Sequence, residues 1–363
     1  MGRGLYKLLL IGVVSSSVIN ITGCSNVSYL MQATGGQMEI LSKAQPIPQI
    51  INDPSTKPAL CKRLQYVEQV RTFASKQLAL PDNGTFQRYC DLQRPYAVWN
   101  VFATKEFSME PEQWCFPIAG CVSYRGYFSE QDAKSEAADL KQKKFDTYIG
   151  GIPTYSTLGW FDDPILSSFI DYSDPDLASI IFHELAHQIV YVPDDTAFNE
   201  SFAVTVEEEG VRRWFNKMHD PAGFKQYKES KKRSEQLTNL ILDSRDKLAA
   251  LYDQPIPDKE KRLAKARIFD EMRQSYETLK TQWGGYDGYD HWMNAPFNNA
   301  KIATVSLYAE NVPEFQALLA KLDDNLPRFY DAVKKLSKLP KEQRDAALAA
   351  NLTKLTMDTN QEP

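Results

Sequence analysis

The chain has 363 residues, of which 43% are hydrophobic, 25% charged and 12% aromatic, and its formal net charge is −5. This is the composition of a globular protein, and it excludes a disordered chain, a collagen-like fibre and a protein with many membrane spans. The slight excess of acidic residues gives no indication of nucleic-acid binding.

The first 24 residues have the anatomy of an export signal. Arg3 and Lys7 precede a short apolar stretch, which is followed by a serine-rich run. The segment ends Ile21-Thr22-Gly23-Cys24, which resembles the bacterial lipobox, in which the cysteine becomes lipidated. We therefore expect residues 1–23 to be a lipoprotein signal peptide and Cys24 to anchor the protein in a membrane. The alternatives are a plain cleaved signal and an uncleaved anchor.

The residues after Cys24 indicate where the anchored protein lies. Ser25 follows the cysteine. In Gram-negative lipoproteins a residue other than Asp at that position indicates the outer membrane, so we expect a lipid anchor there with the protein on the periplasmic face. Residues 24–58 are polar and rich in Gly, Ser and Pro, and we interpret them as a tether.

The cysteine count agrees with export. If Cys24 carries lipid, four of the five cysteines remain, and an even number in an oxidising compartment favours two disulfides. Cys115 and Cys121 flank a short loop, so we pair them, and Cys61 and Cys90 pair by elimination. Three connectivities are possible from the sequence. A zinc cluster is the alternative, but no CxxC spacing supports it.

Helical and strand patterns alternate over the first half of the chain. Residues 61–80 and 131–144 have helical periodicity, and residues 96–103 are rich in the aromatic and β-branched residues of strands. Residues 145–160 are also prone to form a strand, but Gly150, Gly151 and Pro153 interrupt it. We expect an irregular edge strand followed by a loop, because proline is confined to sheet edges. The alternative is an ordinary hairpin with a bulge.

The second half of the chain is predicted to be mostly helical. A well-signalled helix spans 174–190, with Asp174 as its cap, and the next helix starts at Asp195 or Thr196. Residues 222–282 read as a helical hairpin, and residues 298–322 as a helix with a break near Pro313. We therefore predict an α+β fold that is predominantly helical, with one domain over residues 59–363 that includes the hairpin as an insertion.

The sequence His183-Glu184-Leu185-Ala186-His187 is an HExxH motif. Two histidines four residues apart lie on one face of a helix, so both rings can bind one ion. Glu184 is next to the first histidine and can take a proton from water bound to that ion. The motif therefore predicts a zinc site with His183 and His187 as ligands and Glu184 as general base. The alternative is that the two histidines have separate core or surface roles and lie beside an exposed glutamate.

A catalytic zinc site needs a third protein ligand. The sequence offers Asn199-Glu200-Ser201-Phe202-Ala203, an NExxA pattern on the following helix, and we predict Glu200 as that ligand. A carboxylate of Asp194 or Asp195 is the alternative. Glu207 lies two turns beyond Glu200, where it could hold a ligand histidine by its outer N–H. Asn199 is predicted to support the ligands from the same helix. The alternative for Glu207 is a solvated acid.

Four segments together resemble a known family. They are HELAH, NESFA, CFPIAGCVSYRGYF and YIGGIPTYSTLGWFDDP, and they look like those of a bacterial family of predicted aminopeptidases, which are exported, gluzincin-like zinc metallopeptidase lipoproteins. The resemblance implies a gluzincin-like zincin core, in which a pair of active-site helices lies beside a small sheet with an edge strand. It also implies His183, His187 and Glu200 as ligands, and Glu184 as general base.

The mechanism also needs an oxyanion donor and a substrate cleft. Tyr308 is our first candidate for the donor, and the alternatives are Tyr155, Tyr124 and His291, because no spacing rule chooses among them. A peptide substrate would pair with the edge strand just upstream of the zinc helix, so we predict Gly150, Gly151 and Tyr155 as substrate-binding residues.

The sequence thus predicts hydrolysis of peptide bonds in the periplasm by a metal-bound water that Glu184 activates, with aminopeptidase action as the leading interpretation. An endopeptidase with the same mechanism is the first alternative. The second is a non-catalytic periplasmic lipoprotein with a vestigial zinc site, which would bind a partner through its helical hairpin. An intact Glu184 argues against it, because a structural zinc site does not need that residue.

Overall fold

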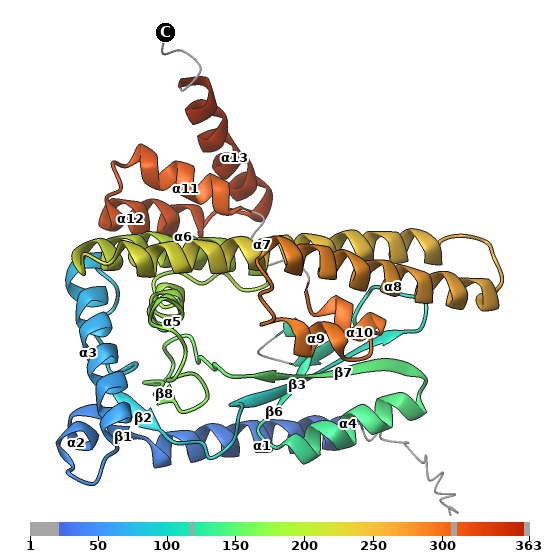
Figure 1. The fold of residues 1–363 in the computed structure, drawn as a ribbon, viewed down its shortest axis with the longest axis horizontal. Coiled ribbons are helices and arrows are strands. Elements are labelled where there is room, and N and C mark those ends of the chain that lie inside the picture. The colour runs from blue at the N-terminus through green and yellow to red at the C-terminus, as the bar shows by residue number, and fades with distance from the viewer. Residues whose placement is uncertain (1–21, 117–119, 306–310, 359–363) are drawn as a thin grey trace, which may run out of the picture.

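The computed structural model describes residues 22–116, 120–305 and 311–358. As predicted, the fold is α+β and predominantly helical. Figure 1 shows the helices α6 (Thr196–Lys217), α7 (Pro221–Tyr252) and α8 (Asp258–Gln282) along one side of the molecule, and α1 (Thr22–Lys43) and α4 (Glu130–Gln142) along the opposite side. The helix that carries HELAH and the sheets lie between these two layers. In the described part of the chain, no helix is both long and apolar enough to cross a membrane.

The main sheet has the order β6-β3-β7. The central strand β3 (Val98–Lys105) pairs antiparallel with β6 (Arg125–Tyr127) and with β7 (Phe145–Ile152). The predicted edge strand is therefore present as β7, and it is regular up to Ile152, with the irregular segment starting at Pro153. Helix α4 covers one face of this sheet through small and apolar side chains, Ala133, Ala137 and Leu140.

Two smaller sheets lie beside it. One joins β1 (Gln45–Pro46), β2 (Arg88–Cys90) and β8 (Ile165–Leu166). The other pairs β4 (Trp114–Phe116) with β5 (Gly120–Val122) and places Cys115 opposite Cys121.

The disulfide predictions are half correct. Cys115 and Cys121 form a disulfide bond, as expected. Cys61 and Cys90, however, are both free thiols, so the predicted second bond is absent. Cys61 lies in the first turn of α3 (Pro58–Leu78), with its thiol near the carbonyl of Ile51, while Cys90 is fully buried in the apolar core beside β8. Pairing by elimination failed because each thiol packs in a different environment.

The hydrophobic core surrounds the HELAH helix, α5 (Asp174–His187). Helices α3, α6, α11 (Val312–Lys321) and α12 (Leu326–Leu336) contribute to this core. Its largest fully buried side chains include Phe182 of α5, Phe198 and Phe202 of α6, Phe315 of α11 and Phe329 of α12.

The predicted helical hairpin is present as α7 and α8, joined by residues 253–257. The short helices α9 (Asp290–Asn294) and α10 (Asn299–Ala303) complete its own apolar cluster. Near the connection the hairpin is tied to the main sheet, because Lys265 Nζ lies 2.9 Å from the carboxylate of Asp146 in β7. The hairpin is therefore held against the main sheet by this ion pair. The helical segment predicted over 298–322 is broken near Pro313, as expected: α10 ends at Ala303, and α11 begins at Val312 with Pro313 in its first turn.

The segment interpreted as a tether is folded, which corrects the prediction for residues 24–58. Helix α1 and the short α2 (Ile47–Asn52) pack on the domain. Their side chains Ile40 and Ile47 are buried, with exposed fractions of 2% and 1%. The side chain of Gln32 bonds the free edge of β6, with Nε2 donating to the carbonyl of Gly126 and Oε1 accepting from the N–H of Phe128. The glycines that suggested a linker serve packing, because a Cβ on Gly36 would lie 2.0 Å from the Phe128 ring.

The C-terminal helix α13 (Lys341–Asp358) is tied to the start of α6. Asp195 caps α6 by accepting a hydrogen bond from the N–H of Phe198, and its carboxylate also pairs with Arg344 of α13. Both side chains of this ion pair are only 4% exposed. Burial opposes ionisation of Asp195, but the bonds from Arg344 and Phe198 outweigh it and lower the pKa of Asp195.

Adjacent glycines test whether α1 is part of the folded domain. Gly36→Ala should lower the free energy of unfolding by about 1–3 kcal/mol, because the methyl group overlaps Phe128. Gly35→Ala should raise it by roughly 0.5–1 kcal/mol, because a Cβ there meets nothing within 4 Å and alanine favours the helix. Denaturant unfolding measures both. If residues 24–58 were a loose tether, neither substitution would change the stability.

The Asp195–Arg344 pair predicts a pH-dependent stability. At pH 7, Asp195→Asn should cost roughly 3–5 kcal/mol, because it leaves Arg344 buried without its counter-ion. The folded-state pKa of Asp195 is lowered, so the difference from wild type should be complete above about pH 4 and be lost as the pH falls through that lowered pKa. Asp194→Asn is the matched control, since Asp194 is exposed and has a positive φ that asparagine tolerates.

Candidate active site

Local sequence signals fix the start of α5. The hydroxyl of Ser173 accepts a hydrogen bond from the N–H of Asp176, and Pro175 occupies the first turn, where its missing N–H costs no helical bond. The cap is thus one residue earlier than the predicted Asp174, whose carboxylate pairs with Arg63 instead. Leu177, Ile181 and Leu185 are fully buried on one face, which directs the histidines toward α6.

The predicted ligand residues converge. The Nε2 atoms of His183 and His187 lie 3.1 Å apart, and the Glu200 carboxylate lies 3.3 Å from His183 Nε2 and 3.6 Å from His187 Nε2. Ligand atoms about 2.0–2.1 Å from a tetrahedral ion are separated by roughly 3.3 Å. The three side chains therefore have the spacing of a site that could hold a metal ion.

The charges around these side chains also suit a cation. Burial lowers the pKa of His183, but the neighbouring Glu200 and Glu207 outweigh it and raise that pKa to about 10. Burial and the adjacent His183 ring lower the pKa of His187 to about 4, so this imidazole is neutral. Burial raises the pKa of Glu184, with Glu200 nearby as a further negative group. Acidic groups thus outnumber cationic ones, and a divalent ion would balance them.

The short connection between α5 and α6 is closed by Asn199. Its Oδ1 accepts from the N–H of Val192 and its Nδ2 donates to the carbonyl of the same residue, both at 2.8 Å. Asp194 adds a positive φ of 60° to this turn. Asn199 thus bonds Val192 through both polar atoms of its side chain, and its predicted support of the histidines stays a prediction. Asn199 orients α6 by holding the chain that enters it.

Glu207 holds His183 in place, as predicted. One carboxylate oxygen lies 3.0 Å from His183 Nδ1. The other accepts hydrogen bonds from the hydroxyl of Ser179 at 2.6 Å and from that of Tyr227 at 3.0 Å, and lies 3.5 Å from Lys231 Nζ. Burial opposes the ionised form, but these partners lower the pKa of Glu207 to about 2. The carboxylate fixes the ring orientation that directs His183 Nε2 at the ligand cluster.

The sequence interpretation missed three of these supporting residues. Ser179 lies one helical turn before His183 on the same face, so helical spacing could have identified it. Tyr227 and Lys231 belong to α7, and no local pattern indicates that this helix reaches the site. The two ligand histidines are held differently, because no group in the described residues bonds His187 Nδ1, which is buried.

Glu184 is bordered by the loop that follows β7. Its carboxylate receives a hydrogen bond from the side chain of Ser156. Asp163 is buried at 1% exposure and accepts bonds from the N–H and hydroxyl of Thr157, which closes the loop over residues 157–163. At Gly159, a Cβ would lie 3.2 Å from the side chain of Gln188, next to His187. The loop therefore runs along the motif helix.

The predicted substrate residues lie upstream of this loop. Gly150 and Gly151 are in β7, and a Cβ on Gly151 would lie 2.3 Å from the Tyr96 ring, so glycine at this position permits Tyr96 to pack. Tyr155 packs edge-on against Phe128, with ring centroids 5.4 Å apart. Each of these residues has a packing role, and their part in substrate binding stays a prediction. Tyr308 lies outside the described residues.

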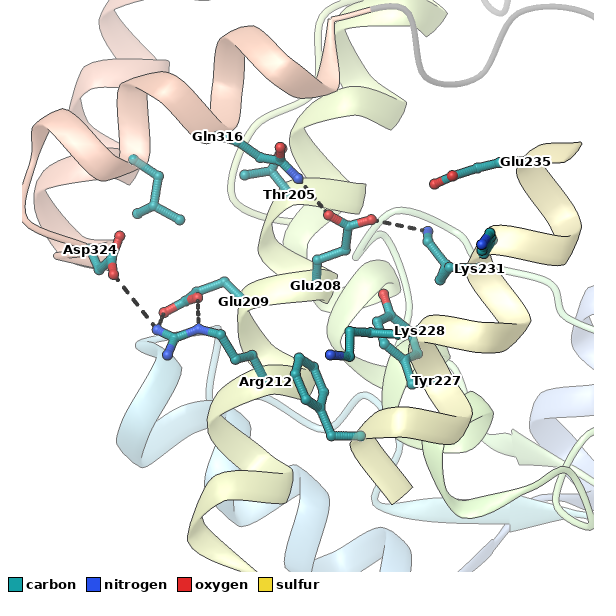
Figure 2. Close-up of a pocket in the computed structure, with 13 residues that line it drawn as sticks. Thr205, Glu208, Glu209, Arg212, Tyr227, Lys228, Lys231, Glu235, Gln316 and Asp324 are labelled. Carbon is teal, nitrogen blue, oxygen red and sulfur yellow. Dashed lines mark hydrogen bonds and ion pairs between the residues drawn. The ribbon is translucent and has the colours of Figure 1, made fainter. Parts of the chain in front are cut away.

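The carboxylates after Glu207 face away from the ligand cluster. Figure 2 shows Glu208 bonded to Gln316 of α11 and to Lys231, and Glu209 bonded to Arg212. These groups line a cavity of about 500 Å³ between α6, α7 and α11. Tyr227 and Lys231 form one wall of that cavity, and they also bond Glu207, so α7 contacts both sides of this region.

Comparison with known proteins gives one match. A family model described as "Putative aminopeptidase" matches residues 28–348 of the chain. No curated protein matches the chain, and no solved structure matches it.

Substitutions at the neighbouring residues Glu207 and Glu208 test whether Glu207 holds His183 in position for a metal ion. Glu207→Gln should weaken binding of a metal ion by roughly 10–100-fold, because it removes the charged acceptor of the ligand histidine. Glu208→Gln should leave the affinity unchanged, because Glu208 bonds Gln316 and Lys231 in the cavity. Competition with a coloured chelator measures both affinities. Equal effects of the two substitutions would contradict the assigned role.

Proposed function

Because this chain belongs to the putative aminopeptidase family, we propose that it hydrolyses peptide bonds with a zinc ion held by His183, His187 and Glu200. The observation that carries the proposal is the convergence of these three side chains at separations of 3.1–3.6 Å, with Glu184 beside the first histidine. Two imidazoles and one carboxylate are a frequent donor set of catalytic zinc, which leaves a position for water or substrate. When bound, zinc would polarise the substrate carbonyl and lower the pKa of a water molecule.

The chain's own residues supply the proton transfers. Glu184 would take a proton from the attacking water onto its carboxylate and later give it to the leaving amine. Burial raises the pKa of Glu184, which makes its carboxylate a stronger proton acceptor than an exposed glutamate. Ser156 bonds the same carboxylate and would hold it toward the substrate. Glu207 keeps His183 fixed throughout, since its other oxygen is anchored by Ser179 and Tyr227.

The family supports an aminopeptidase over an endopeptidase. An aminopeptidase must recognise a free α-amine, which carboxylates usually do. Glu208 and Glu209 are occupied by other partners, as is the buried Asp163. The residue that recognises the amine is therefore not among these, and endopeptidase action with the same site is the second candidate.

We also propose that the protein is a lipoprotein, anchored through Cys24 in the outer membrane and facing the periplasm. The lipobox-like sequence before Cys24 supports this, and so does the Cys115–Cys121 disulfide, since such bonds persist in oxidising compartments.

Glu184→Gln separates catalysis from metal binding. The variant should lose about 10²–10⁴-fold in kcat/KM on peptides, because glutamine cannot accept the proton, while its zinc content should equal that of wild type. Peptide turnover and metal analysis of the same preparation measure the two properties. Full zinc content with no turnover by wild type on any peptide would favour the non-catalytic alternative.

The same assay identifies the type of peptidase. An aminopeptidase should cleave a peptide with a free N-terminus and not its N-acetylated counterpart. Equal cleavage of the two would assign an endopeptidase.

A further inference from the structure

The first turn of α1 contains the cysteine that we propose to be lipidated. Cys24 is the third residue of α1, and the same helix is bonded to β6 by Tyr29, whose hydroxyl accepts from the N–H of Gly126 at 3.2 Å, and by Gln32. At 1.5 Å per residue, Tyr29 lies only about 8 Å along the helix from Cys24. A lipid on Cys24 would therefore be joined to the folded domain by a helix, without a flexible spacer.

The outer face of α1 carries three exposed apolar side chains and the exposed Thr34, whose hydroxyl donates to the carbonyl of Leu30 within the helix. Leu30, Met31 and Met38 are 48%, 71% and 54% exposed, in contrast to the buried Ile40 on the inner face. The helix contains no charged residue before Glu39, which forms an ion pair with Lys43. The exposed methionines therefore form an apolar strip that is free of charge up to Met38, where the Glu39–Lys43 ion pair borders it.

The strip is aligned with the anchor. Met31 follows Cys24 by seven residues, and Met38 follows Met31 by seven more. Seven residues make almost two full turns of an α-helix, so residues 24, 31 and 38 lie on one side of the α1 backbone. The strip extends about 21 Å from the cysteine along that side. Two independent features, the cysteine and the exposed methionines, thus select the same side of one helix.

We propose that the outer face of α1, formed by Leu30, Met31 and Met38, lies in the surface of the lipid bilayer that holds the acylated Cys24. This inference rests on the lipid anchor proposed above. Acyl chains inserted at residue 24 keep the helix at the membrane, where apolar side chains on the same side leave water for the interfacial region. A helix with polar or charged side chains on that side would be held away from the bilayer.

This contact would orient the whole domain. Figure 1 shows α1 along one side of the molecule, and α7, α8 and α11–α13 along the side opposite it. With α1 on the bilayer, the hairpin and the C-terminal helices face away from the membrane, and the candidate metal site lies between the two layers. The candidate metal site would therefore lie at a fixed height above the membrane, and the substrate would bind there.

A fluorescent reporter on α1 tests the contact. Gly35 lies within the outer face, and a side chain there meets nothing within 4 Å, so Gly35→Cys can carry the environment-sensitive dye NBD. Ser275→Cys, exposed on α8, is the matched control, and Cys61→Ser removes the partly exposed thiol from both. The full-length protein is processed in a Gram-negative host, purified and reconstituted into phosphatidylethanolamine and phosphatidylglycerol vesicles. Mass spectrometry of its N-terminal peptide reports acylation.

The expected result is an acylated Cys24 with a blue-shifted and severalfold brighter NBD emission at residue 35, and an unchanged emission at residue 275. The substitutions Met31→Glu and Met38→Glu together should abolish the shift at residue 35 without removing the acyl chains. An acylated protein whose reporter at residue 35 behaves like that at residue 275 overturns the contact. An unacylated N-terminus overturns the anchor and the contact with it. Peptide hydrolysis by the same preparation reports separately on the proposed peptidase, so failure of either proposal is distinguishable from failure of the other.

Discussion

The crossing of α5 and α6 is the constraint on which the site depends. Figure 1 shows α5 almost along its axis while α6 runs across the view, so the two helices cross steeply. Small residues permit the contact: Ala178 and Ala186 of α5 and Ala203 of α6 are fully buried, and a Cβ on Gly210 would lie 2.8 Å from the Phe182 ring. The crossing brings Glu200 within 3.3 Å of His183. Burying these polar groups together is costly unless each finds a partner, and a divalent ion could bond all three at once.

Helix α7 is as much a part of this site as the two ligand helices. Tyr227 and Lys231 contact the carboxylate that holds His183, and Lys231 also reaches Glu208 in the cavity behind α6. The hairpin is therefore coupled to the ligand set through one glutamate. An insertion that would otherwise be interpreted as a separate module contributes side chains to the candidate metal site.

How far the sequence could predict this protein depended on the range of the contacts involved. The HExxH spacing and the NExxA pattern are local, and they identified the three side chains that converge, because helical geometry alone sets which side chains share a face. The hairpin and the edge strand were also predictable from periodicity and from proline and glycine positions. Residues 24–58 were misread as a tether because their composition was judged without the partners that bury them, such as Phe128 against Gly36. The Cys61–Cys90 pairing and the contribution of Tyr227 depend on distant contacts that no local spacing records. Asn199 differs from them, because it bonds Val192, seven residues earlier.

The ion pair between Asp195 and Arg344 joins the beginning of the second ligand helix to a residue near the far end of the chain. Synthesis starts at the N-terminus, so His183, His187 and Glu200 are made before Arg344. Until then the turn that leads into α6 carries a buried carboxylate without its guanidinium partner. The order of synthesis therefore leaves the entry to α6 without this ion pair until the last helix is made. A chain shortened by a single helix at its C-terminus would retain His183, His187 and Glu200 while lacking Arg344.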